Sequence, residues 1–269
     1  MIFVDLDPED LHHLAKILME NQLLIDLLID ARRNGRPVSV SADLPIPSDA
    51  HVADIVQLAV VRHFGLIGAY KVFQVGQTEG KWGAIPATRV LVSPAKIDAT
   101  LSEFKIEAEI AFRFGRDLPL RQDGSDYSTP DVWAAVGGAF AAFELLETRF
   151  PSITHRDPLL VRADAMGNSG LVIGREVESW RSAVKPDVAV RVEIGNKTVV
   201  DQRGGHPSGD PAHPLVWLAN ALARTDHWIK AGDIVTTGSF GGSHLILPGE
   251  SAVASIDGFD SIHFTLVAN

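Results

Sequence analysis

The sequence contains no cysteine among its 269 residues, and this absence narrows the chemistry open to the protein. Disulfides, thiolate metal sites and cysteine nucleophiles are excluded, so any bound metal must rely on oxygen or imidazole ligands. The ten histidines form no His-x-x-x-His pattern, so each is better explained as a surface or core residue than as a ligand. Carboxylates are therefore the ligands to look for.

Basic clusters and long apolar runs are also lacking. No apolar stretch reaches the roughly 18 residues of a membrane span, and the first residues are acidic, unlike a secretory signal. A net charge of −10 does not suit a nucleic-acid surface, which needs clustered Lys and Arg. We expect a soluble, cytoplasmic protein that binds neither nucleic acid nor membrane, and the missing cysteines fit such a reducing compartment.

Phosphate-binding loops, Gly-x-Ser-x-Gly nucleophile elbows and internal repeats are absent as well. The chain does have 46% hydrophobic residues, enough for a sizeable core at this length. Asp7 and Pro8 are typical of a helix start, followed by hydrophobic residues at helical spacing up to Gly35. A second helix is expected over residues 52–60, ended by Gly65.

From residue 66 onward, short β-branched and apolar segments alternate with glycine, proline and aspartate, which is typical of strands. We therefore expect an N-terminal helical part over residues 1–65 and a strand-rich domain over residues 66–269. A helix is also expected over residues 212–224. The last strand should alternate between apolar and polar residues around Phe264.

Two acids interrupt an otherwise apolar strand pattern at residues 104–114. Side chains at i and i+2 of a strand share a face, so Glu107 and Glu109 point to one side while Ile106 and Ile110 point to the other. Carboxylates that share a poorly solvated site raise each other's pKa unless a cation offsets them, and a hard divalent metal does this well. The alternative is an exposed edge strand whose polar face carries glutamates.

Other candidates are more isolated in the sequence. After a helix expected over residues 131–140, Glu144 stands among hydrophobic residues, and a helix-linked strand can return it to the same sheet. Lys71 lies in an apolar strand, either as a functional residue or as a surface lysine. Asp164 either orients a ligand or caps a turn. Ser239 lies in a glycine-rich turn whose N–H groups either bind a carboxylate or simply connect strands.

A set of longer motifs occurs in a recognisable order and spacing. These are Ala31-Arg32-Arg33-Asn34-Gly35-Arg36-Pro37, Tyr70-Lys71-Val72, Ile106-Glu107-Ala108-Glu109-Ile110-Ala111-Phe112, Gly115-Arg116-Asp117-Leu118, Phe143-Glu144-Leu145-Leu146-Glu147-Thr148-Arg149, Ala163-Asp164 to Gly174, and Trp217-Leu218-Ala219-Asn220 to Gly238-Ser239. Together they resemble the fumarylacetoacetate hydrolase superfamily over nearly all of the chain. Within it, they are most similar to the group of 2-hydroxypentadienoate (2-oxopent-4-enoate) hydratases and 2-oxo-3-hexenedioate decarboxylases.

The resemblance implies an α+β fold, a strand-rich mixed β-sheet roll with an N-terminal helical part. It implies Mg²⁺ or Mn²⁺ held by Glu107, Glu109 and Glu144, and a small 2-oxo acid whose carboxylate and 2-oxo oxygens chelate the metal. Lys71 is then the catalytic residue beside the substrate, where a cation stabilises the charge of an enolate. Lys71, Lys81, Asp164 and Ser239 are the expected substrate-binding residues, and related assemblies imply a homo-oligomer.

Three departures from the family pattern concern the substrate. Lys81-Trp82-Gly83 replaces the usual Asp-Phe-Gly of the hydratases, Asp164-Ala165 replaces Asp-Asn, and Asp54 stands where a tyrosine is common. Our hypothesis is a lyase of aromatic degradation that hydrates a 2-hydroxy-2,4-dienoate (2-oxo-4-enoate) to a 4-hydroxy-2-oxo acid. The alternatives are a decarboxylase or C–C hydrolase of a related 2-oxo (di)acid, which the added lysine favours, or a non-catalytic partner subunit, against which the three retained glutamates argue.

Overall fold

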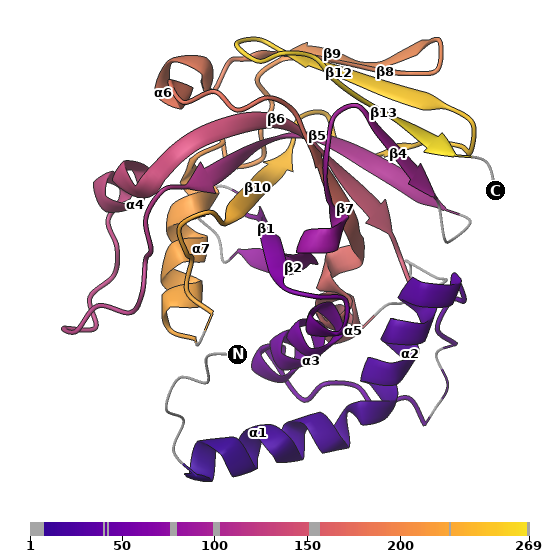
Figure 1. Cartoon of the computed structure of the whole chain (residues 1–269), viewed down its shortest axis with the longest axis vertical. Coiled ribbons are helices and arrows are strands. Elements are labelled where there is room, and N and C mark those ends of the chain that lie inside the picture. The colour runs from indigo at the N-terminus through magenta and orange to yellow at the C-terminus, as the bar shows by residue number, and fades with distance from the viewer. Residues whose placement is uncertain are drawn as a thin grey trace.

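The computed structural model describes residues 8–39, 41, 43–75, 80–98, 103–150, 157–225 and 227–267. These residues form N-terminal helices and two β-sheets (Figure 1), as the expected strand-rich α+β fold requires. The α-helices are α1 (Pro8–Glu20), α2 (Gln22–Asn34), α3 (Ala50–His63), α4 (Thr129–Ala135), α5 (Pro158–Ala163), α6 (Trp180–Ala183) and α7 (His213–Ala223). No helix in the described part of the chain is long and apolar enough to cross a membrane.

The N-terminal part holds three helices where two were expected. The first hydrophobic repeat is interrupted at Asn21, whose side-chain amide donates to the Ile17 carbonyl (2.9 Å). A side chain that competes for backbone partners disfavours a continuous helix, so α1 and α2 flank Asn21. Gly35 ends α2 in the left-handed conformation (φ 65°), as expected. The N-cap expected at Asp7 lies outside the described residues, and the domain boundary at residue 66 stays a prediction.

The larger sheet is mixed and has the strand order β2-β1-β10-β5-β6-β7-β3, with β11 also paired to β5. Its outer strand β2 is antiparallel to β1, whereas β1 is parallel to β10. The central pair, β5 and β6, runs antiparallel over almost its whole length. The strands are β1 (Ile67–Phe73), β2 (Lys81–Pro86), β3 (Val90–Val92), β5 (Phe104–Phe114), β6 (Val136–Glu147), β7 (Asn168–Ile173), β10 (Ile234–Ser239) and β11 (His244–Leu245).

The start of β6 corrects one expectation. A helix was expected over residues 131–140, but α4 ends at Ala135 and the strand begins at Val136. The two residues that follow are glycines, which are poor helix formers. A Cβ on Gly138 would lie 2.1 Å from the Glu176 carboxylate, so glycine here lets the Glu176 side chain lie against the strand. Pairing with β5 therefore overrides the helical pattern here.

The smaller sheet has the order β4-β13-β12-β8-β9 and lies on the opposite side of the larger sheet from helices α1 to α3 (Figure 1). Its last strand shows the expected alternation, with Ile262, Phe264 and Leu266 buried. The strands are β4 (Ala95–Asp98), β8 (Ala189–Ile194), β9 (Lys197–Arg203), β12 (Ser251–Ile256) and β13 (Ile262–Val267).

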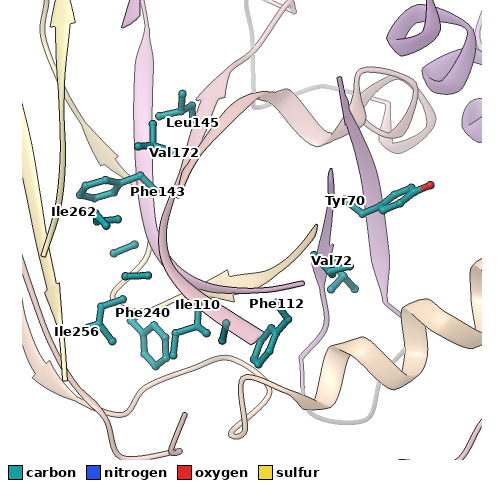
Figure 2. Packing of buried hydrophobic residues seen from close by; sticks show 14 of the residues in the cluster. Tyr70, Val72, Ile110, Phe112, Phe143, Leu145, Val172, Phe240, Ile256 and Ile262 are labelled. Atoms are coloured by element: carbon teal, nitrogen blue, oxygen red, sulfur yellow. The ribbon is translucent and has the colours of Figure 1, made fainter. Parts of the chain in front are cut away.

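The main hydrophobic core fills the space between the two sheets. Phe143 of β6 packs edge to face against Phe264 of β13, with ring centroids 5.4 Å apart. In Figure 2 the large sheet curls, and core residues such as Ile110 and Phe143 lie on the outer side of its curve. Because side chains alternate along a strand, their neighbours in β5 and β6 point into the inside of the curve.

Candidate metal centre

Three glutamates meet on the inner face of the large sheet. The register of β5 and β6 places Glu107 directly opposite Glu144. Glu109, two residues along β5, points to the same side, and one carboxylate oxygen from each of the three lies within 4.8 Å of the others. The return of Glu144 to the sheet of Glu107 and Glu109, expected from the sequence, is confirmed.

The surroundings of these glutamates are those of a buried site. β5 is a central strand between β10 and β6, so the alternative of an exposed edge strand is wrong. Glu109 and Glu144 are each 1% exposed. Ala111 and Ala142 share their face of the sheet, and these small side chains leave room for the carboxylates.

Glu109 is held through one of its two oxygens. The Thr236 hydroxyl and the Gly238 N–H (3.0 Å) both donate to Oε2 of Glu109. The N–H groups of the glycine-rich turn were expected either to bind a carboxylate or simply to connect strands, and here the Gly238 N–H, near the end of β10, binds a carboxylate of the protein itself. Ser239 is the cross-strand partner of Glu109, next to Gly238. Its role with substrate stays a prediction.

Glu144 is held in a similar way through Oε1. The Lys71 ammonium donates to this oxygen, and so does the Asn168 side-chain amide at 3.0 Å. Burial lowers the pKa of Lys71, but the carboxylates of Glu144 and Glu107 more than offset this, and the net direction is upward. Lys71 is therefore a buried ammonium ion at neutral pH, and the alternative of a surface lysine is wrong.

The proximity of the glutamates also changes their own titration. Burial raises the pKa of Glu109 well above its ordinary value, and repulsion from Glu144 and Glu107 raises it further. Burial and repulsion from Glu144 likewise raise the pKa of Glu107, although Lys71 opposes this. The cluster thus stores like-charge repulsion when all its members ionise, and a bound cation would relieve that repulsion.

A cavity of about 470 Å³ opens beside the glutamates and is lined by them and by Lys71, Lys81, Arg162 and Met166, among others. Lys81 of β2 is the cross-strand partner of Phe73. Since Phe73 and Lys71 lie two residues apart on β1, Lys81 points to the same face as Lys71, about 7 Å further along the strand direction. The cavity wall therefore carries cationic side chains at more than one distance from the glutamates.

Asp164, expected to bind substrate, and Asp54, which stands where a tyrosine is common, both lie in ion pairs. Asp54 binds Arg162 in a bidentate pair (2.6 and 2.8 Å). Asp164 is 2% exposed and accepts from Arg149 Nε (2.7 Å) and Arg32 Nη2 (3.4 Å). A direct contact of Asp164 with substrate stays a prediction, whereas its contacts with the two arginines are plain in the structure.

Sequence reasoning missed several residues of this site. Thr236, Asn168 and Met166 fall inside the longer motifs but have no pattern of their own that marks a role, and Arg162 lies just before one of these motifs. Thr236 reaches Glu109 only because β10 is placed beside β5, and Arg162 reaches the cavity from α5. Strand order and helix docking are long-range properties, so a local pattern could not have found these residues.

The donor set fits a hard divalent cation. Three carboxylates with one ammonium group carry a net negative charge when ionised, and they lie close enough to share one ion. Carboxylate oxygens are the ligands that Mg²⁺ and Mn²⁺ prefer. Glu107, Glu109 and Glu144 are the residues that would hold such an ion.

Comparisons with known proteins agree with this geometry. A family model described as fumarylacetoacetate (FAA) hydrolase C-terminal matches residues 82–267. The 2-keto-4-pentenoate hydratase 2 of Dechloromonas aromatica (strain RCB) is 28% identical over 250 residues, covering 88% of this chain and 93% of the relative. The family model thus spans well over half of the chain, including all three glutamates.

Solved structures share the fold. The 4-oxalocrotonate decarboxylase from Pseudomonas putida G7, complexed with magnesium and adipate, superposes with a TM-score of 0.79 at 20% identity, covering 94% of this chain and 98% of that one. Fumarylpyruvate hydrolase from Pseudomonas aeruginosa, in complex with Mn²⁺ and pyruvate, gives 0.58 at 15% identity, covering 75% and 89%. The chain is therefore a member of the fumarylacetoacetate hydrolase family, an enzyme related to the 2-keto-4-pentenoate hydratases and 4-oxalocrotonate decarboxylases.

Proposed function

We propose that the protein is a divalent-metal-dependent lyase that hydrates a 2-hydroxy-2,4-dienoate (2-oxo-4-enoate) to a 4-hydroxy-2-oxo acid. The observation that carries this proposal is the meeting of Glu107, Glu109 and Glu144 within 4.8 Å, on the wall of a cavity that also holds Lys71. Its hydratase relatives and the Mg²⁺ and Mn²⁺ of its structural neighbours support the proposal.

A divalent cation bound there would supply the positive charge that favours an enolate form of a 2-oxo acid. The protein's own contribution begins with Glu109 and Glu144, each fixed by two hydrogen-bond donors. Such fixed ligands lose little freedom on binding. Lys71 is charged while it faces the ionised glutamates, and in that state it would act as a proton donor to a substrate oxygen or carbon.

A second reaction, decarboxylation of a related 2-oxo diacid, is favoured by Lys81. This side chain lines the cavity on the same face as Lys71, where it would face the far end of a substrate whose carboxylate lies at the glutamates. The P. putida decarboxylase that shares the fold is complexed with adipate, a diacid. Both reactions need the same stabilised enolate, so they differ only at the far end of the substrate.

One pair of assays tests the proposal and separates the two reactions. Activity is measured on 2-hydroxypenta-2,4-dienoate and on 2-oxohex-3-enedioate, with the protein stripped by EDTA and then reloaded with Mg²⁺ or Mn²⁺. We expect stripping to abolish activity and either metal to restore it. Full activity in verified metal-free protein would contradict the proposal.

Lys81→Asp should speed hydration, since a positioned general acid or base contributes typically about 10²–10⁴ in rate. Release of CO₂ from the diacid by wild type identifies a decarboxylase.

The small 2-oxo acid is the only partner that this proposal requires. The homo-oligomeric state and the cytoplasmic location expected from the sequence and its resemblance stay predictions.

A further inference from the structure

The turn that joins α5 to β7 has an unusual backbone. Three consecutive residues, Ala165 (φ 50°), Met166 (φ 54°) and Gly167 (φ 75°), are in the left-handed region. Glycine adopts this conformation readily, but a residue with a side chain does so at a cost of about 1–2 kcal/mol. Two such residues in a row persist only where the surroundings hold them, and backbone strain of this kind gathers at functional sites.

Two arginines, the buried Arg149 and the partly buried Arg32, hold both ends of this turn. Arg149, 2% exposed, donates to the carbonyl of Asp164 (3.1 Å) and to the carbonyl of Asn168 (2.8 Å). Arg32 reaches the same two carbonyls at 3.3 and 3.2 Å. The Asp164 carboxylate in turn accepts from Arg149 Nε at 2.7 Å. Hydrogen bonds from charged donors contribute more to stability than neutral ones. Arg149, Arg32 and Asp164 together form a clamp, which can offset the backbone strain between the two ends of the turn.

The strand beside the turn is shaped to receive it. A Cβ on Gly83 of β2 would lie 2.8 Å from the carbonyl oxygen of Ala165, so only glycine lets the turn approach this closely. The turn therefore rests on the same sheet that carries the glutamates. Met166 lines the cavity from this position.

At the end of the turn, Asn168 contacts the metal centre. Its side chain is 1% exposed, and its Nδ2 donates to Oε1 of Glu144 at 3.0 Å. Lys71 occupies the same oxygen, so the two donors together fix the carboxylate plane. Because the two arginines hold the backbone of Asn168, its side-chain amide binds Glu144 from a fixed position, through one hydrogen bond.

We propose that Asn168 is a positioning residue for Glu144, and that Arg149, Arg32 and Asp164 clamp the left-handed turn in order to hold it there. This inference rests on the proposed metal centre. It assigns Asp164 an indirect role, through the turn, where a direct contact with substrate had been expected. Outer-shell partners of metal ligands typically contribute about 10–100-fold in metal affinity.

The test is a calorimetric titration of metal-free protein with Mn²⁺ at pH 7.5, comparing wild type with Asn168→Ala and Asn168→Leu. The Asn168 amide makes two hydrogen bonds, to Glu144 (3.0 Å) and to the Gly170 carbonyl (3.4 Å). Asn220→Ala is the matched control, because this amide also makes two, with the backbone of Tyr127 (2.7 and 3.0 Å), but in the contact between α7 and the loop before α4. We expect both Asn168 variants to bind Mn²⁺ about 10–100-fold more weakly. The control should stay within about twofold of wild type, with a comparable loss of stability without metal.

Each outcome has a distinct meaning. Wild type that binds no Mn²⁺ would overturn the proposed metal centre itself. Asn168 variants that bind as tightly as wild type would overturn the positioning role while leaving the metal centre intact. If neither variant folds while Asn220→Ala does, Asn168 belongs to the fold and the inference is equally overturned.

Discussion

The protein contains two neighbouring clusters of charged residues in its interior, and they differ in how their charges are paired. In the first, Glu107, Glu109 and Glu144 face one another with Lys71 as their cation. In the second, Arg149 (2.7 Å) and Arg32 share the carboxylate of Asp164, and both arginines also bind the backbone at the two ends of a turn.

The pairing of charges in each cluster indicates its role. Buried charges are stable when paired and hydrogen-bonded, and costly when alike. Asp164 and Arg149 meet this condition with the protein's own groups, so this cluster can serve structure, although burial and the charge of Arg149 lower the pKa of Arg32 to about 9. The glutamate cluster has Lys71 as its own cation, and under the proposed function a bound divalent cation would complete its charge balance. Asn168 links the two, since its carbonyl belongs to the clamp and its amide to Glu144.

The largest effect is expected from breaking the internally paired cluster. Arg149→Met keeps the length of the side chain but removes the charge, leaving the buried Asp164 with a weaker partner. Losing one member of a buried ion pair typically costs about 3–5 kcal/mol. Urea unfolding at pH 7.5 should show a loss of this order. A loss below about 1 kcal/mol would mean that the clamp contributes little.

A smaller effect should follow from pH in the metal-free protein. Burial, with repulsion from Glu144, raises the pKa of Glu109 in the folded state. A carboxyl with a raised folded pKa costs stability as pH rises through its unfolded pKa of about 4.3, and the cost levels off above the folded pKa. Wild type in EDTA should therefore lose stability relative to Glu109→Gln between pH 4.5 and 8. Parallel stability curves for the two proteins would contradict the raised pKa.

The smallest effect concerns the strained turn. Ala165→Gly relieves a left-handed alanine and should raise the free energy of unfolding by up to about 1 kcal/mol. The matched control is Ala163→Gly, two residues earlier and also buried, but in helix α5. There glycine should lower stability by about 1 kcal/mol. Equal losses in both variants would show that the turn stores no strain.

The sequence predicts the glutamate cluster better than the arginine cluster, for a physical reason. Two acids at i and i+2 in an apolar strand are visible locally, because strand geometry alone puts them on one face. The clamp has no such signal. Arg149 and Asp164 meet through the docking of α5 and the turn, and Arg32 arrives from α2.

The same reasoning explains where the fold predicted from the sequence was wrong. The breaks at Asn21 and at Val136 went unseen because hydrophobic spacing continues through both positions. At the first, a side-chain amide competes with the backbone. At the second, pairing with β5 decides the conformation. The strand that carries Glu107 and Glu109 matched expectation at both ends, since every second residue from Phe104 to Phe114 is apolar.

The claim that Glu107, Glu109 and Glu144 bind a divalent cation is tested most directly by thermal unfolding of the metal-free protein with and without Mn²⁺ at pH 7.5. At a hundredfold excess over Kd, binding should add about 2.7 kcal/mol, or roughly 5–10 °C in Tm for a chain of this size. Glu109→Gln should remove most of this rise while leaving the metal-free protein as stable as wild type or slightly more so. The claim would be contradicted if wild type showed no rise, or if Glu109→Gln kept the full rise or strongly destabilised the metal-free protein.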